Sequence, residues 1–144
     1  MKAASTSTNV AGVDASVRVS RQVAADAHHP LSQTWLEAFV GNGGQWVAPV
    51  WLLAEVVGAI SRRTTEARLG QAALKMVLGL PALRIVSVER RLGMRAAQLA
   101  ADLGLRGAEA GYVALAQQLK VPLITLDQEQ LDRTSRIIIA RQPT

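Results

Sequence analysis

Short apolar segments alternate with longer segments of helical periodicity along almost the whole of this chain, and this alternation limits the folds that it can adopt. The apolar segments are rich in Val, Ile and Leu, a composition typical of buried strands. The predicted strands lie at residues 8–13, 45–48, 83–88, 121–126 and 136–140. Strands that alternate with helices favour an α/β fold. The sequence therefore predicts a five-stranded, mostly parallel sheet flanked by helices.

Helical periodicity and helix-ending residues define the segments between these strands. Pro49 is well placed in the first turn of a helix that continues through Arg63. Thr64 or Thr65 can cap the helix that follows. Helices are predicted over 31–40, 49–63, 65–78, 89–103 and 108–119, with a short helical turn after Asp127. The chain thus has enough alternating elements for one α/β domain.

Length and composition fit a single domain with a substantial core. The chain has 144 residues, of which 49% are hydrophobic and 19% charged, so extended disorder is excluded. Neither an internal repeat nor a low-complexity linker divides it. We expect residues 1–8 to form a flexible N-terminal tail and residues 9–141 to form one domain.

Several classes of function are excluded by residues that the chain lacks. With no cysteine, the chain has no disulfide framework, no thiolate zinc site and no cysteine nucleophile, which suits a reducing cytoplasm. The N-terminus has no apolar signal core, and the longest apolar stretch, 47–60, is shorter than the roughly 18 residues of a membrane span. The net charge of +5 permits a nucleic-acid partner without requiring one. We therefore expect a cytoplasmic protein that has no membrane partner.

Four of the eleven acidic residues stand in apolar surroundings. Asp14 and Asp127 follow predicted strands, whose carboxyl ends form the edge at which such sheets bind ligands. Glu55 and Glu109 lie on predicted helices, where the residues three and four positions away are mostly apolar. Burying an unpaired carboxylate is unfavourable, and a bound divalent cation would compensate the charge. The four acids together therefore suggest a metal site.

Each acid taken alone also has an ordinary structural interpretation. Asp14 or Asp127 can serve as the N-cap of a helix or as a turn residue. A glutamate in an apolar helix can pair with one of the thirteen arginines. The order of the four acids along the chain and their positions on the predicted elements are more specific than any one of them.

The four acids lie in segments that resemble a known family. These segments are VDAS at 13–16, APVWLLAEVVGAISRR at 48–63, LRGAEAGYVALAQQL at 105–119 and PLITLDQEQL at 122–131. Together they resemble the PIN-domain ribonucleases, and most of all the VapC-type toxins of bacterial toxin–antitoxin pairs. The resemblance extends from Val10 to about Ile139, and it implies a single PIN-like domain that hydrolyses RNA phosphodiesters with the help of a metal.

The family resemblance assigns roles to the four acids. An aspartate follows the first strand, a glutamate lies on the helix after the second strand, an acid opens a late helix, and an aspartate follows the fourth strand. These catalytic roles fall on Asp14, Glu55, Glu109 and Asp127. Asp14, Glu109 and Asp127 would bind Mg²⁺ or Mn²⁺, and Glu55 would complete the acidic pocket. The pattern departs from the family at Glu109, where aspartate is usual, so the change could be harmless, could favour manganese or could weaken the nuclease.

Other residues are expected to support the site. Ser16 and Thr125 carry hydroxyl groups beside the two strand-end aspartates and would donate hydrogen bonds to them. Basic residues near the predicted active edge, which can contact RNA phosphates, are Arg18, Arg21, Arg106 and Arg133. Of these, Arg18 and Arg106 are the predicted nucleic-acid contacts. The resemblance also implies a cognate antitoxin protein as partner and a homodimer.

Two alternatives remain. The first is a PIN module with weakened catalysis that binds nucleic acid or a protein partner, with Glu109 as the sign of lost activity. The second is an unrelated α/β phosphotransfer protein, which the sequence disfavours. A haloacid-dehalogenase-like phosphatase needs an aspartate where Ser16 stands, and a receiver domain needs an aspartate at the end of the third strand, which here reads Val86–Ser87–Val88.

Overall fold

The computed structural model describes residues 9–17 and 29–144 of the protein. These residues contain one sheet whose strands are β1 (Val10–Val13), β2 (Gln45–Pro49), β3 (Leu83–Val86), β4 (Leu123–Ile124) and β5 (Ala140–Arg141). The strand order is β3-β2-β1-β4-β5, and every pair of neighbours is parallel. The predicted α/β fold with a five-stranded sheet is confirmed. Residues 1–8, the predicted tail, lie outside the described residues.

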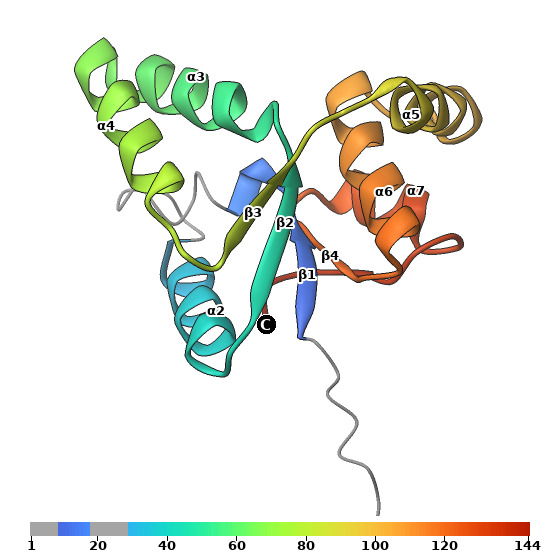
Figure 1. Ribbon diagram of the computed structural model, residues 1–144, viewed down its shortest axis with the longest axis horizontal. Coiled ribbons are helices and arrows are strands. Elements are labelled where there is room, and N and C mark those ends of the chain that lie inside the picture. Colours follow the sequence, from blue (N-terminus) through green and yellow to red (C-terminus); the bar gives the residue numbers. More distant parts are fainter. Residues whose placement is uncertain (1–8, 18–28) are drawn as a thin grey trace, which may run out of the picture.

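Helices surround the sheet (Figure 1). They are α2 (His29–Gly41), α3 (Leu52–Thr64), α4 (Ala67–Leu78), α5 (Arg90–Leu103), α6 (Gly107–Leu119) and α7 (Gln128–Thr134). Helix α3 packs closely on α4, and α5 packs closely on α6. Among the described helices, none is both long enough and apolar enough to cross a membrane.

The strands send side chains into two hydrophobic clusters, as expected from the alternating direction of side chains along a strand. In β4, Leu123 belongs to the larger cluster and Ile124 to the smaller one. Helix α6 is central to the larger cluster, because residues 110–116 are all buried. The smaller cluster joins β1 to α2 and includes Val13 and Leu36. The sheet is therefore covered on both faces, which is characteristic of parallel sheets.

Two helix boundaries differ from the sequence prediction. Pro49 does not begin a helix: it is the last residue of β2 and pairs with Val86, while α3 begins at Leu52. Neither threonine caps α4. Thr65 ends α3 in a left-handed conformation (φ 57°), and Glu66 precedes α4. The proline is tolerated in β2 because it lies at the end of the strand, where fewer ladder hydrogen bonds are lost.

The last predicted strand, 136–140, is also wrong in its position. The amides of Ile137 and Ile138 both donate to the Thr134 carbonyl (3.0 and 3.2 Å), so these β-branched residues form a turn after α7. Only at Ala140–Arg141 does the chain pair with β4. The strand propensity of these residues is overridden because their amides are hydrogen-bonded to the last residue of α7.

Candidate functional site

The carboxyl ends of β1 and β4 lie side by side and carry the first predicted site residues. The Asp14 amide donates to the Ile124 carbonyl (2.9 Å), which fixes the residue after β1 against the end of β4. The Ser16 hydroxyl accepts a hydrogen bond from the Leu126 amide (3.1 Å) and joins the same two segments two residues later. Parallel pairing thus brings Asp14 and Asp127 to one edge of the sheet.

Asp14 is buried, with 8% of its surface exposed. Its Oδ2 accepts hydrogen bonds from the Ser16 amide (3.1 Å) and the Thr125 hydroxyl (3.4 Å). Burial raises the pKa of this carboxyl, and the hydrogen bonds only partly oppose that effect. Asp14 is therefore a carboxylate whose charge is poorly compensated by the protein around it.

The Thr125 hydroxyl takes part in several hydrogen bonds of this region. It also lies 2.9 Å from the Gln130 amide oxygen and accepts a hydrogen bond from the Asp127 amide (3.0 Å). A hydroxyl has one proton to donate, so Asp14 and Gln130 compete for it, and the shorter distance favours Gln130. Ser16 thus contacts Asp14 through its amide, whereas Thr125 contacts both Asp14 and Asp127 through its hydroxyl.

Glu55 lies on α3 and is bonded to α6. The Tyr112 hydroxyl donates to Glu55 Oε1 at 2.9 Å. Burial raises the pKa of the Glu55 carboxyl, the Tyr112 hydrogen bond opposes this, and the negative charges of Asp14 and Glu109 raise it further. Tyr112 itself is buried, and burial together with the Glu55 charge raises the pKa of its phenol, so it remains a donor.

A close contact between Trp51 and Gly111 sets the separation of α3 and α6. A Cβ at Gly111 would lie 1.8 Å from Trp51 Cζ2, so only glycine leaves room for the indole there. Trp51 immediately precedes α3, and its carbonyl accepts the Glu55 amide (3.0 Å). The indole seated on Gly111 therefore brings Glu55 within reach of Tyr112, the next residue of α6.

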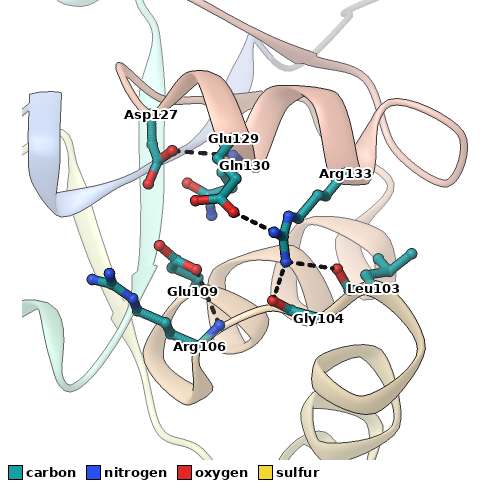
Figure 2. Close-up of polar contacts among 8 residues, drawn as sticks. All are labelled: Leu103, Gly104, Arg106, Glu109, Asp127, Glu129, Gln130 and Arg133. Carbon is teal, nitrogen blue, oxygen red and sulfur yellow. Dashed lines mark hydrogen bonds and ion pairs between the residues drawn. The ribbon is translucent and has the colours of Figure 1, made fainter.

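Glu109 and Asp127 each cap a helix and face one another (Figure 2). Glu109 Oε2 accepts the Arg106 amide (3.1 Å) at the start of α6, and Asp127 Oδ1 accepts the Gln130 amide (3.1 Å) at the start of α7. Burial raises the pKa of the Glu109 carboxyl, and the nearby Asp127 contributes in the same direction. The N-cap interpretation of Asp127 is thus confirmed, alongside its place near the other acids.

The four carboxylates influence one another electrostatically. The charge of Asp127 raises the pKa values of both Asp14 and Glu109. The charges of Asp14 and Glu109 raise the pKa of Glu55. Their oxygen donors suit a hard divalent cation such as Mg²⁺ or Mn²⁺. One oxygen of each carboxylate already accepts a hydrogen bond from a protein donor. Within residues 9–17 and 29–144, no three Asp, Glu, His or Cys side chains are arranged to hold an ion. The donor chemistry fits such an ion, whereas the side chains would have to turn to surround it.

A groove of about 870 Å³ opens beside the acids. Glu55 and Asp127 line it together with Arg62, Arg63 and Arg106. The positive charge of Arg106 lowers the pKa of the Glu109 carboxyl, against the effect of burial. The groove thus combines acidic groups with arginines, which suits an anionic polymer that must approach a metal.

Of the predicted basic contacts outside the groove lining, Arg133 is the one that the structure describes. Arg133 reaches the carbonyls of Leu103 and Gly104 and pairs with Glu129, so it ties α7 to the turn between α5 and α6 (Figure 2). Arg18 and Arg21 lie outside the described residues.

Sequence reasoning missed Tyr112, Arg62 and Arg63. Tyr112 contacts a residue 57 positions away, which no local pattern reveals. Arg62 and Arg63 follow Glu55 by seven and eight positions, two turns of a helix, so their position on the same face of α3 was open to prediction.

Comparisons with known proteins identify the family and the fold. The PIN domain family model matches residues 13–137. No protein of curated function matches the sequence.

Solved structures share the fold at low sequence identity. VapC20 of Mycobacterium tuberculosis, a Sarcin-Ricin loop cleaving toxin, has 17% identity and a TM-score of 0.72 over 90% of this chain and 96% of its own. VapBC2 of Rickettsia felis, solved bound to a DNA fragment from its promoter, has 15% identity and a TM-score of 0.69 over 92% and 98%. FitAcB of Neisseria gonorrhoeae has 17% identity and a TM-score of 0.63 over 92% and 97%. The family model covers most of the chain, and the protein belongs to the PIN domain family.

Proposed function

We propose that this protein is a Mg²⁺- or Mn²⁺-dependent endoribonuclease and the toxin of a toxin–antitoxin pair. The observation that carries the proposal is the cluster of Asp14, Glu55, Glu109 and Asp127, four carboxylates from different elements beside one groove. Burial raises the pKa of three of them, which is expected where a cation is meant to supply the missing charge.

The proposed mechanism divides the work among the chain's own residues. Asp14, Glu109 and Asp127 hold the cation, which when bound supplies positive charge at the scissile phosphate and makes a nearby water more acidic. Glu55 completes the pocket, and Tyr112 fixes its orientation. Arg106, at the rim, contacts RNA phosphate. Thr125 and Ser16 keep the strand ends and their aspartates in register.

The proposed partners follow from the family and from related structures. The similar structures include a toxin–antitoxin complex from Klebsiella pneumoniae, with 16% identity and a TM-score of 0.65. We propose that a cognate antitoxin binds this chain as well, that the protein acts in the cytoplasm, and that it forms a homodimer. Light scattering on the purified chain tests the dimer, and growth arrest on expression that is relieved by the antitoxin tests the pairing.

A catalytically weakened module that binds nucleic acid is a second candidate function. It is favoured by Glu109, whose Oε2 is bonded to the Arg106 amide, and by the lack of a ready three-ligand site among the described acids. Replacing Glu109 by aspartate distinguishes the two. A large gain of cleavage in Glu109→Asp over an inactive wild type supports the weakened module.

The proposal is tested by incubating structured RNA with the purified chain in Mg²⁺, in Mn²⁺ and in EDTA. Cleavage that requires the metal supports the ribonuclease. RNA that is bound but left intact in both metals supports the weakened module instead.

A further inference from the structure

We propose that Arg62 forms a phosphate-binding subsite that holds the RNA strand beside the four acids. The inference rests on the proposed ribonuclease function and names a substrate contact for the same groove. It is carried by the position of Arg62 on α3, the direction of its side chain and its charge.

The position follows from the helix. Glu55, Ala59, Arg62 and Arg63 all line the groove, and their spacing places them along one face of α3. Arg62 follows Glu55 by seven positions, which corresponds to roughly 10 Å along the helix axis. A strand of RNA whose scissile phosphate lies at the acids would therefore have another phosphate within reach of Arg62.

The direction of the side chain is set by Gly58. A Cβ at Gly58 would lie 2.9 Å from Arg62 Nη1, so the guanidinium lies back over the glycine. Gly58 is between Glu55 and Arg62 on the helix, and side chains in helices lean toward the N-terminus. The absence of a side chain at Gly58 thus lets the guanidinium point along α3 toward the acids.

The charge of Arg62 is not used by the described parts of the protein. Arg62 is exposed and makes no hydrogen bond or ion pair with residues 9–17 or 29–144, whereas Arg68 pairs with Glu66 and Arg95 with Gln117. A guanidinium presents parallel donors that match two phosphate oxygens. Arg106 lines the same groove at the start of α6, so the strand would meet positive charge from two elements.

The subsite is tested by RNA binding in the full chain carrying Asp14→Asn, which keeps the RNA intact. A short single-stranded RNA is titrated at several salt concentrations with Arg62→Ala and, as the matched control, Arg68→Ala. We expect Arg62→Ala to weaken binding about tenfold and to lower the slope of log affinity against log salt by about 0.7, the value for one phosphate contact with a single strand. Arg68→Ala should leave both unchanged.

Gly58→Ala probes the direction of the guanidinium separately. Alanine favours the helix, so the variant should fold at least as well, while its Cβ displaces Arg62. We expect weaker RNA binding than in the background, and no further loss when Gly58→Ala is added to Arg62→Ala.

Equal RNA affinity and salt slope for Arg62→Ala and Arg68→Ala would overturn the subsite, as would a full additional loss from Gly58→Ala in the Arg62→Ala chain. Failure of the proposed function is a separate result, since it is seen as absent metal-dependent cleavage by the wild type.

Discussion

The Tyr112 hydroxyl donates a 2.9 Å hydrogen bond to Glu55 Oε1 and joins α6 to α3 at the acidic cluster. The phenol is buried, and Trp51 packed on Gly111 fixes the spacing of the two helices. Groups that orient metal-site carboxylates in this way are often nearly as important as the ligands. Tyr112 is therefore a positioning residue for Glu55.

Replacing Tyr112 by phenylalanine removes this hydrogen bond and leaves the ring in place. We expect kcat for RNA cleavage to fall about tenfold with little change in KM, because Glu55 loses its fixed orientation. The free energy of unfolding should fall by about 1 kcal/mol. Steady-state kinetics and urea unfolding measure the two effects.

A merely structural role for Tyr112 would give a different pattern. If Tyr112 acts through Glu55, Tyr112→Phe should add no further loss of kcat in the Glu55→Gln chain. Independent losses in the double variant would contradict the positioning role.

Removing the Asp14 charge should stabilise the metal-free protein at neutral pH. The pKa of Asp14 is raised in the folded state, so protonation of this carboxyl favours the folded protein. This contribution to stability is lost as the pH rises from the ordinary carboxyl range of about 4 through the raised pKa. Asp14→Asn cannot ionise and escapes this loss. The stability of the variant relative to the wild type should therefore grow with pH.

Chemical unfolding of the two proteins in EDTA over a series of pH values measures this difference. Subtracting one curve from the other removes the contributions of the remaining acids. A difference that is constant with pH would show that Asp14 ionises as easily in the folded as in the unfolded chain.

Glu109 can be tested without disturbing its cap. Glu109→Gln retains an oxygen that accepts the Arg106 amide but loses the charge, so we expect Mn²⁺ affinity to fall about tenfold or more while the fold is kept. Mn²⁺ binding is followed by electron paramagnetic resonance. Glu66→Gln, at an exposed site before α4, serves as the control, and equal Mn²⁺ affinity in the two variants would exclude Glu109 as a ligand.

The contact of Trp51 with Gly111 predicts that two glycines of α6, Gly111 and Gly107, differ in the effect of an alanine substitution on stability. Gly111→Ala forces a methyl group into the indole and should lower the free energy of unfolding by about 2 kcal/mol or more. Gly107→Ala, where the added Cβ meets nothing within 4 Å, should change it by less than about 0.5 kcal/mol. Thermal unfolding compares them, and similar losses in both would contradict the close contact of Trp51 with Gly111.

The sequence was informative where local pattern and burial agree. The alternation of strands and helices predicts the sheet, and apolar neighbours single out Asp14, Glu55, Glu109 and Asp127 before any geometry is known. The residues 136–139 were misassigned because the hydrogen bonds of Thr134 outweigh the strand propensity of three isoleucines. Tyr112 was missed because its partner lies on another helix, and the sequence does not encode that α3 and α6 approach at Gly111.

The ribonuclease proposal depends above all on Asp14, the most buried acid of the cluster and the residue that follows the central strand. The measurement is the rate of RNA cleavage by the wild type and by Asp14→Asn, each with Mn²⁺ and with EDTA. We expect metal-dependent cleavage by the wild type and a rate at least about a hundredfold lower in the variant, because charge stabilisation at the phosphate amounts to several kcal/mol. Equal cleavage by the two proteins would contradict the proposal.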